Sequence, residues 1–275
     1  MKKITFADIS IFLVDKVFHW RFWIAGTTRK SKIMKTIIDN LLFQTDDVAI
    51  IPNTKSININ QKIESEGTEF LPTDVLKEVI KKCDDIYIMN DCLCRTSNKC
   101  KDYPQDIGCI FLGPTARKIP KHLCHKATKE EAIAHVNAAD EAGLSHLIGR
   151  NKIDSMWMNV HPRKGLLTIC HCCPCCCLWK VVPNLEESIQ EKIYRLPGVS
   201  ISLDEDKCKV CKRCLRDICL SKAIEFKDGK IIINKDQCRG CGHCANICKH
   251  KAISISYTDD SIQSVINRCY NLIEE

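Results

Sequence analysis

The sequence lacks a phosphate-binding loop, a nucleophile elbow and a hydrophobic run long enough to span a bilayer. Neither G-x-G-x-x-G nor G-x4-G-K-[ST] occurs in it, and no C-x3-C-x2-C triplet stands as a clean motif. Nothing therefore marks a flavin or nicotinamide site. A basic stripe interleaved with aromatic residues is also missing, so nucleic-acid binding is not expected. What the chain has instead is cysteine, 21 among 275 residues.

The most apolar stretch near the start, residues 11–26, is interrupted by Asp15, Lys16, His19 and Arg21. It is too short and too charged for a transmembrane helix, and no clean cleavage site follows it. We expect a cytoplasmic protein, in which thiols stay reduced and clustered cysteines indicate metal or redox chemistry. Residues 11–25 could contact a membrane surface, but packing on the domain or on a partner subunit is favoured.

Hydrophobic periodicity predicts a mixture of helices and short strands. Residues 1–43 read as helical, and strands are expected at 48–53, 56–62 and 85–91. Two further helices are expected, one at 71–83 with Thr73 as N-cap and one at 127–143 with a Thr128–Glu131 capping box and Gly143 as C-terminal cap. Arg150 and Lys152, in the stretch GLSHLIGRNKID at residues 143–154, read as a solvated turn.

An internal repeat fills the last third of the chain. Residues 206–233 and 236–256 both open with C-x2-C-x2-C, add a fourth cysteine and close with Ala-Ile before a short strand. This pattern is typical of bacterial two-cluster ferredoxins, in which three thiolates hold one cubane and the fourth ligand comes from the other half. The spacing predicts two 4Fe-4S clusters, one held by Cys208, Cys211, Cys214 and Cys248 and the other by Cys238, Cys241, Cys244 and Cys219.

Two details depart from that pattern. Four residues, not three, separate Cys214 from Cys219, and Leu220 and Lys249 stand where a proline usually follows the fourth cysteine. Neither change removes a ligand. A pair of zinc ribbons fits poorly, because zinc sites use two separated C-x2-C knuckles. Gly240 and Gly242 would let backbone amides approach cluster sulfur.

The formal net charge is +7, from 41 Lys and Arg against 34 Asp and Glu. An oxidised all-thiolate 4Fe-4S site adds about two negative charges, so two such sites would leave a balance near ~+3. This mild balance is typical of an ordinary solvated surface, with an acidic partner face as the alternative reading.

Ten more cysteines form two tight groups ahead of the repeat. They are Cys92, Cys94, Cys100 and Cys109, followed by Cys170, Cys172, Cys173, Cys175, Cys176 and Cys177. In the second group Cys170, Cys173 and Cys176 form a third C-x2-C-x2-C, and this spacing is expected to bring thiols onto neighbouring turns. An additional iron–sulfur cluster or clusters are favoured, with structural zinc and then a thiol relay as alternatives.

Other residues near these groups are less informative. Cys83, Cys124 and Cys269 read as small buried hydrophobic residues. Arg95 could donate hydrogen bonds to an anionic cluster, although a surface arginine is an equal alternative. His122, His125 and His171 lie near cysteines, and a structural role is favoured for each.

The motifs DCLCR, GCIFLG, GLSHLIGRNKID, TICHCCPCCCLW and CRGCGHC resemble a group of cysteine-rich ferredoxin-like proteins of strict anaerobes, including methanogenic archaea. The resemblance covers about residues 40–258. It implies iron–sulfur redox function in an anaerobic cytoplasm, and it supplies no substrate.

We therefore expect an α+β protein of three parts: a mixed cysteine-rich, metal-binding domain at 1–197, a small two-cluster ferredoxin module at 198–258 and a helical tail at 259–275. An electron carrier serving a partner oxidoreductase is favoured over an enzyme. The alternatives are a reductase with an active-site cluster or dithiol in the N-terminal domain, and a zinc-stabilised adaptor with a ferredoxin tail. No catalytic residue is assigned.

Overall fold

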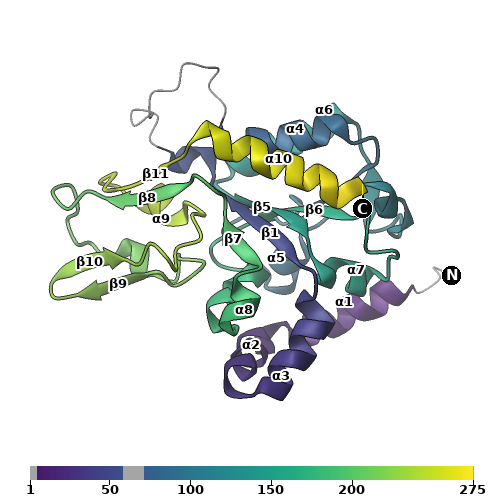
Figure 1. The fold of residues 1–275 in the computed structure, drawn as a ribbon, viewed down its shortest axis with the longest axis horizontal. Coiled ribbons are helices and arrows are strands. Elements are labelled where there is room, and N and C mark those ends of the chain that lie inside the picture. Colours follow the sequence, from purple (N-terminus) through teal and green to yellow (C-terminus); the bar gives the residue numbers. More distant parts are fainter. Residues whose placement is uncertain (1–4, 58–70, 275) are drawn as a thin grey trace.

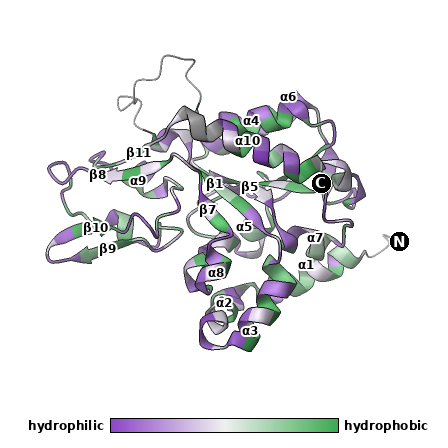
Figure 2. Ribbon diagram, in the orientation of Figure 1, coloured by the Kyte–Doolittle hydropathy of each residue, from purple (hydrophilic) through white to green (hydrophobic). Residues whose placement is uncertain are grey.

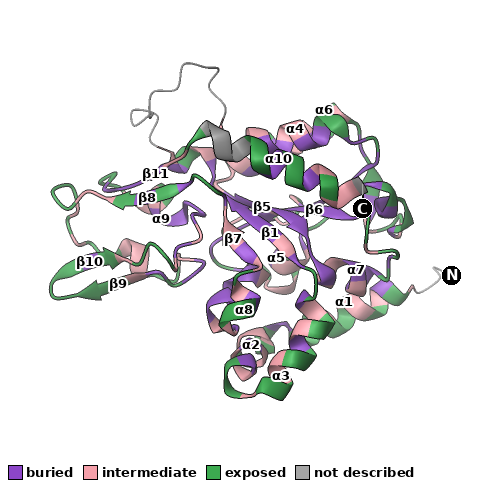
Figure 3. Cartoon of the chain, in the orientation of Figure 1, coloured by how far each residue is buried: buried purple, intermediate pink, exposed green. Residues whose placement is uncertain are grey.

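A seven-stranded sheet forms the centre of the computed structural model, which describes residues 5–57 and 71–274 (Figure 1). Its strand order is β4(Cys124–Lys126), β2(Ile86–Met89), β3(Ile110–Leu112), β6(Leu167–Cys172), β5(Ser145–Arg150), β1(Asp47–Ile51) and β7(Ile193–Arg195). Neighbours are antiparallel except for β1 and β7. The central strands are buried (Figure 3), because helices cover both faces of the sheet. The α+β class is thus confirmed.

One face carries α4(Asp74–Lys82), α6(Lys129–Glu141) and α10(Asp259–Glu274). The capping box of α6 and the left-handed Gly143 after it are as the sequence predicts. Thr73 precedes α4, but its hydroxyl contacts Thr54 instead of capping the helix. Helix α10 returns the C-terminal end of the chain to the sheet, where Cys269 joins the core formed with α4.

The opposite face is covered by the N-terminal helices and by segments near the cysteines (Figure 1). The elements are α1(Phe6–Val17), η1(Phe18–Trp20), α2(Arg21–Lys30), α3(Lys32–Ile38), the π-helical η2(Asp39–Phe43), α7(Lys152–Met158), η6(Leu178–Asn184) and α8(Glu187–Gln190). Their apolar residues form a second core below the sheet. No helix in the described ranges has the length and apolar character needed to cross a bilayer.

Apolar residues occur along these N-terminal helices (Figure 2), and many of their large side chains remain exposed. Those more than 45% exposed are Phe6, Ile9, Phe12, Leu13, Val17, Trp20, Trp23, Ile33 and Leu41. We call this set the N-terminal apolar face. A single exposed leucine needs no explanation, but a concentration of this kind usually marks an interaction surface.

The C-terminal repeat lies at one end of the sheet (Figure 1). It contains two antiparallel pairs, β8(Ser200–Leu203) with β11(Ile253–Ser256) and β9(Ile224–Lys227) with β10(Lys230–Ile233). Short helices η7(Arg213–Leu215) and α9(His243–Ile247) follow the cysteine turns. A bridge from Ile57 to Ile255 ties the repeat to the chain beyond η3(Thr54–Ser56).

The expected strands at 48–53 and 85–91 correspond to β1 and β2. Most of the strand expected at 56–62 lies outside the described residues. The remaining short elements are α5(Leu93–Ser97) and η5(Pro114–Lys118).

Candidate metal centres

The two halves of the C-terminal repeat share one backbone design. Asp204 and Asn234 each accept hydrogen bonds from the amides two and three residues later, all at 3.1 Å. Their carbonyl oxygens accept the amides of Cys208 and Cys238, the first cysteine of each triplet. These bonds fix where each cysteine turn begins, so the sequence repeat is also a structural repeat.

Backbone amides point at cysteine sulfur in both halves. Ala223 donates to Cys219 at 3.2 Å, Ala252 to Cys248 at 3.3 Å and Gly240 to Cys238 at 3.4 Å. Such bonds stabilise negative charge on sulfur and tune the potential of a bound cluster. The interpretation of Gly240 as an amide donor agrees with this contact.

The first predicted ligand set lies at the outer end of the module. Its four members line one small cavity: Cys208, Cys211, Cys214 and Cys248. Cys211 is exposed, and Lys209, Lys212 and Arg213 surround the same cavity. A group held here would be close to solvent and to a basic rim.

The second predicted set lies against the N-terminal domain. Its members are Cys219, Cys238, Cys241 and Cys244, and the last three are buried. Burial, followed by the proximity of Cys219, raises the pKa of Cys241 to about 12. A bound metal overcomes such a shift because it deprotonates the thiols that coordinate it.

Close packing explains why glycine occurs twice in the second triplet. A Cβ on Gly240 would lie 2.8 Å from Cγ of Arg195, and one on Gly242 would lie 2.2 Å from Oγ of Ser56. Both residues have positive φ. The equivalent residues of the first triplet, Val210 and Lys212, also have positive φ, but Val210 is half-buried and Lys212 is exposed. The second triplet is thus shaped to fit the N-terminal domain.

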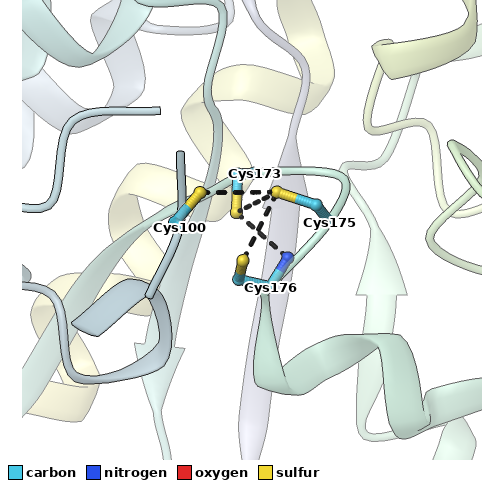
Figure 4. Close-up of side chains that lie close together, drawn as sticks. All are labelled: Cys100, Cys173, Cys175 and Cys176. Atoms are coloured by element: carbon cyan, nitrogen blue, oxygen red, sulfur yellow. Dashed lines mark hydrogen bonds between the residues drawn. The ribbon is translucent and has the colours of Figure 1, made fainter. Parts of the chain in front are cut away.

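The ten N-terminal cysteines separate into two groups. Four of them have sulfur atoms within 4.8 Å of one another: Cys100, Cys173, Cys175 and Cys176 (Figure 4). The Sγ atom of Cys175 is central. It lies 3.6 Å from Sγ of Cys100, 3.5 Å from Sγ of Cys173 and 3.4 Å from Sγ of Cys176. Four converging thiols are a donor set that suits either a zinc ion or an iron–sulfur cluster. We call this the four-cysteine group.

The other six line a neighbouring small cavity together with Arg95, His171 and Trp179, and Cys173 of the four-cysteine group lines this cavity too. They are Cys92, Cys94, Cys109, Cys170, Cys172 and Cys177. Two pairs are close, Cys109 with Cys170 at 3.6 Å and Cys172 with Cys177 at 2.9 Å. We call this the six-cysteine group.

This division corrects the expectation that the cysteines at 170–177 lie on neighbouring turns. Cys170 and Cys172 belong to strand β6, so only the cysteines after them lie on the following turn. The apparent triplet is therefore split, since Cys170 joins the six-cysteine group while Cys173 and Cys176 join the four-cysteine group.

Arg95 lies between the two groups and is only 1% exposed, so the surface alternative is wrong. Its guanidinium donates to the carbonyl oxygens of Pro104 at 2.6 Å, His171 at 2.7 Å and Ile107. These acceptors are neutral, and a buried cation needs compensating negative charge. Burial lowers the pKa of Arg95, but the negative charge of neighbouring cysteines raises it overall. Cys92 contributes the largest of these charge effects and Cys173 the next largest. Thiolates, as in a metal centre, would supply that charge.

The three histidines near cysteines occupy different surroundings. His122 contacts Asp8 at 2.8 Å, and His125 contacts Asn90 and Glu131, all away from the cysteine groups. His171 is buried, and its Nδ1 lies 2.8 Å from Nδ1 of His146. Burial holds the pKa of His171 well below its usual range, so the imidazole of His171 is neutral.

A polar contact that sequence reasoning missed connects the two halves of the protein. Nε2 of His243, beside ligand candidate Cys244, lies 3.0 Å from Oγ of Ser145, which donates to the carbonyl oxygen of Cys172 at 3.4 Å. The only available signal was His243 inside the second triplet. Cys241 and Cys172 also share one apolar core.

Residues 231–254 match the family model described as 4Fe-4S binding domain. The chain is 38% identical over 76 residues to the indolepyruvate oxidoreductase subunit IorA of Methanothermobacter marburgensis, which is 24% of this chain and 12% of that protein. An uncharacterised ferredoxin of Methanocaldococcus jannaschii is 44% identical over 48 residues, 16% of this chain and 29% of the relative. The matches thus span less than a third of either relative. No solved structure matches the chain significantly.

These findings identify a cysteine-rich, ferredoxin-like chain with a C-terminal 4Fe-4S binding domain and relatives in methanogens. The matches favour electron transfer of the ferredoxin type at the C-terminal repeat.

Proposed function

We propose that this cysteine-rich, ferredoxin-like chain carries low-potential electrons between a partner oxidoreductase and a metal centre of its own N-terminal domain. 4Fe-4S clusters supply one-electron oxidation and reduction. The main observation behind this proposal is that the second triplet is buried against the N-terminal domain. Hydrogen bonds through His243 and Ser145 connect it to Cys172. An isolated carrier would not need this interface.

The proposed ligands in the C-terminal module are those the spacing predicts, two sets of four cysteines. They fit because the first set lines one cavity and because both sets receive amide hydrogen bonds, at Cys248 in the first and at Cys219 and Cys238 in the second. We also propose domain limits of 1–197, 198–258 and 259–275. The chain folds these parts together, since Cys269 of α10 packs in the core of the first.

For the N-terminal domain we propose iron–sulfur chemistry at the four-cysteine and six-cysteine groups, with zinc as the alternative at the first. The buried Arg95 supports anionic centres at this place. A reducing, anaerobic cytoplasm is the proposed location, because crowded thiols survive there without random oxidation.

The partner is proposed to dock where the first triplet is exposed. Lys209, Lys212 and Arg213 around Cys211 would attract an acidic face, and such steering weakens with salt. The relatives named as oxidoreductase subunits support a partner of this class.

The N-terminal apolar face supports a second contact, with an anionic membrane surface through residues 11–25. Trp20 and Trp23 are exposed, as is Lys16 of the same segment, a combination suited to the interfacial region. Flotation of the full chain with phosphatidylglycerol vesicles tests this contact. The contact is supported if the wild-type chain floats with the vesicles and the double variant Trp20→Ser, Trp23→Ser does not. It is refuted if the same amount of protein is recovered in the top fraction with and without vesicles.

Anaerobic iron, sulfide and zinc analysis of the full chain tests the main proposal. We expect clearly more than about eight irons per chain, the content of two cubanes. Cys100→Ser with Cys173→Ser, and separately Cys109→Ser with Cys170→Ser, should each lower the iron content, while Cys83→Ser leaves it unchanged. An iron content near eight per chain, with zinc also present, would favour a zinc-stabilised adaptor instead.

A reductase with an active-site cluster or dithiol is the other candidate function. It is favoured by a cavity that lies beside the six-cysteine group.

A further inference from the structure

A cavity of about 280 Å³ lies between the N-terminal helices and the six-cysteine group. Its walls are apolar and include Phe18, Ile38, Leu42, Phe43, Phe111 and Trp179. Its inner side is formed by sulfur-bearing residues, since Cys92, Cys94, Cys109 and Cys170 all line it. The volume is close to the lower end of small-molecule sites, roughly 300–1,000 Å³.

Among the described residues that line this cavity, Arg21 is the one with a cationic side chain. Arg21 at the start of α2 is held by Phe18, whose carbonyl oxygen accepts from Nη1 at 2.7 Å and whose ring lies 4.1 Å from the guanidinium carbon. The Nε atom of Arg21 is buried and has no hydrogen-bond partner among the described residues. Arg95 is fully engaged by three carbonyl groups, whereas Arg21 keeps a buried donor for a further acceptor.

The acid that lines the cavity is already occupied. The carboxylate of Asp154 accepts from Nδ2 of Asn151 at 2.7 Å and from Nε1 of Trp157 at 3.1 Å. It therefore has little capacity left for a cationic ligand. The polar character presented to a guest comes mainly from Arg21, which favours an anion.

We propose that this cavity binds a small apolar carboxylate, with its carboxylate on Arg21 and its apolar part against the aromatic walls beside the six-cysteine group. The inference deepens the proposed function, on which it rests for the redox role of those cysteines. It names the class of molecule that would meet a metal centre held there. A carboxylate matches the planar guanidinium in geometry as well as in charge.

Anaerobic calorimetric titration of the full chain with decanoate, decan-1-ol and decylamine tests the proposal. These probes share one tail and differ in head group. Decanoate should bind at least tenfold more tightly than decan-1-ol, and decylamine most weakly. Arg21→Met should remove the advantage of decanoate, while exposed Lys30→Met should keep it. Leu42→Trp, which fills the cavity, should weaken decanoate and decan-1-ol alike.

Equal affinities for decanoate and decan-1-ol, or an unchanged preference in Arg21→Met, would overturn the proposal. So would the absence of binding in wild-type protein with full iron content. Iron and sulfide analysis of each sample separates this failure from that of the electron-transfer proposal. Decanoate binding through Arg21 in a chain without N-terminal metal would sustain the ligand site and refute the redox role.

Discussion

The hydroxyl of Ser145 lies 3.0 Å from Nε2 of His243, at the contact between the second cysteine triplet and strand β5. Both residues are buried. Burial lowers the pKa of His243 to about 4, so the imidazole is neutral at physiological pH. Since the serine donates to Cys172, Nε2–H of His243 is the donor to Oγ. One hydroxyl thus connects the backbone of the six-cysteine group to the ferredoxin module.

Replacing this hydroxyl is expected to destabilise the protein. Ser145→Ala leaves a buried N–H without its acceptor, which costs about 1–3 kcal/mol. Anaerobic urea unfolding measures the loss. Ser200→Ala removes an exposed serine pair, with Ser256 at 2.7 Å, and should change the free energy of unfolding by less than about 0.5 kcal/mol. Equal values for the two variants would contradict the role given to Ser145.

The first triplet contains an unfavourable backbone conformation that can be relieved. Val210 has φ of 49°, a region that disfavours a β-branched residue. Val210→Gly should stabilise the chain by about 0.5–1 kcal/mol, since relief of strain exceeds the added freedom of the unfolded chain. Gly240→Val at the equivalent position should instead destabilise it, because Arg195 occupies the space. Thermal unfolding under argon compares the two, and a lower midpoint for Val210→Gly would refute the strain.

The contact at Gly242 predicts a rescue. Gly242→Ala would place a methyl group 2.2 Å from Oγ of Ser56, and φ of 80° adds strain. We expect a loss of more than about 2 kcal/mol in the free energy of unfolding. Adding Ser56→Gly should recover part of it, because the clashing side chain is gone. If the loss of stability in the double variant equals the sum of the losses in Gly242→Ala and Ser56→Gly, the two residues do not interact.

The spacing of the eight C-terminal cysteines predicts their grouping because it acts locally. Three positions at two-residue intervals belong to one turn, and the repeat supplies the crossed fourth member. Sequence could not show which triplet would be buried. That depends on Ser56 and Arg195, which lie far from Gly242 and Gly240 along the chain and meet them only in the fold.

The N-terminal cysteines were recognised as unusual but could not be sorted. Their grouping depends on strand β6 ending at Cys172, which sends Cys170 to one group and Cys173 to the other. The reading of Arg150 and Lys152 as a solvated turn was wrong for a related reason. Arg150 is the last residue of strand β5, which is buried on both faces, and Lys152 begins α7, where its Nζ donates to Gln44 at 3.0 Å inside the protein. Polar residues after a central strand are misleading when their partners are distant in sequence.

Asp46 should make stability fall as pH rises. Burial raises its pKa from 3.8 to about 8. Between these values the folded state keeps a proton that the unfolded state has released, so the free energy of unfolding decreases with rising pH and levels off above about 8. Each pKa unit corresponds to about 1.4 kcal/mol. Asp46→Asn should remove most of this slope in urea unfolding, whereas exposed Asp102→Asn should retain it. An unchanged slope in Asp46→Asn would assign the dependence to other groups.

One substitution, Arg95→Met, tests whether the N-terminal cysteines carry negative charge. It removes three hydrogen bonds to carbonyl oxygens in either case, so some loss of stability is expected even from neutral thiols, and the iron content decides between the two states. If the cysteines were neutral thiols, the loss would come without any change in iron content. If they are metal-bound thiolates, removing the cation leaves buried negative charge uncompensated, which costs about 3–5 kcal/mol. We expect the second result, together with reduced iron content, in anaerobic unfolding and metal analysis. Lys230→Met is the control, because Lys230 is largely exposed and pairs with the equally exposed Glu205 at 2.7 Å. It should change stability by less than about 1 kcal/mol and leave the iron content intact.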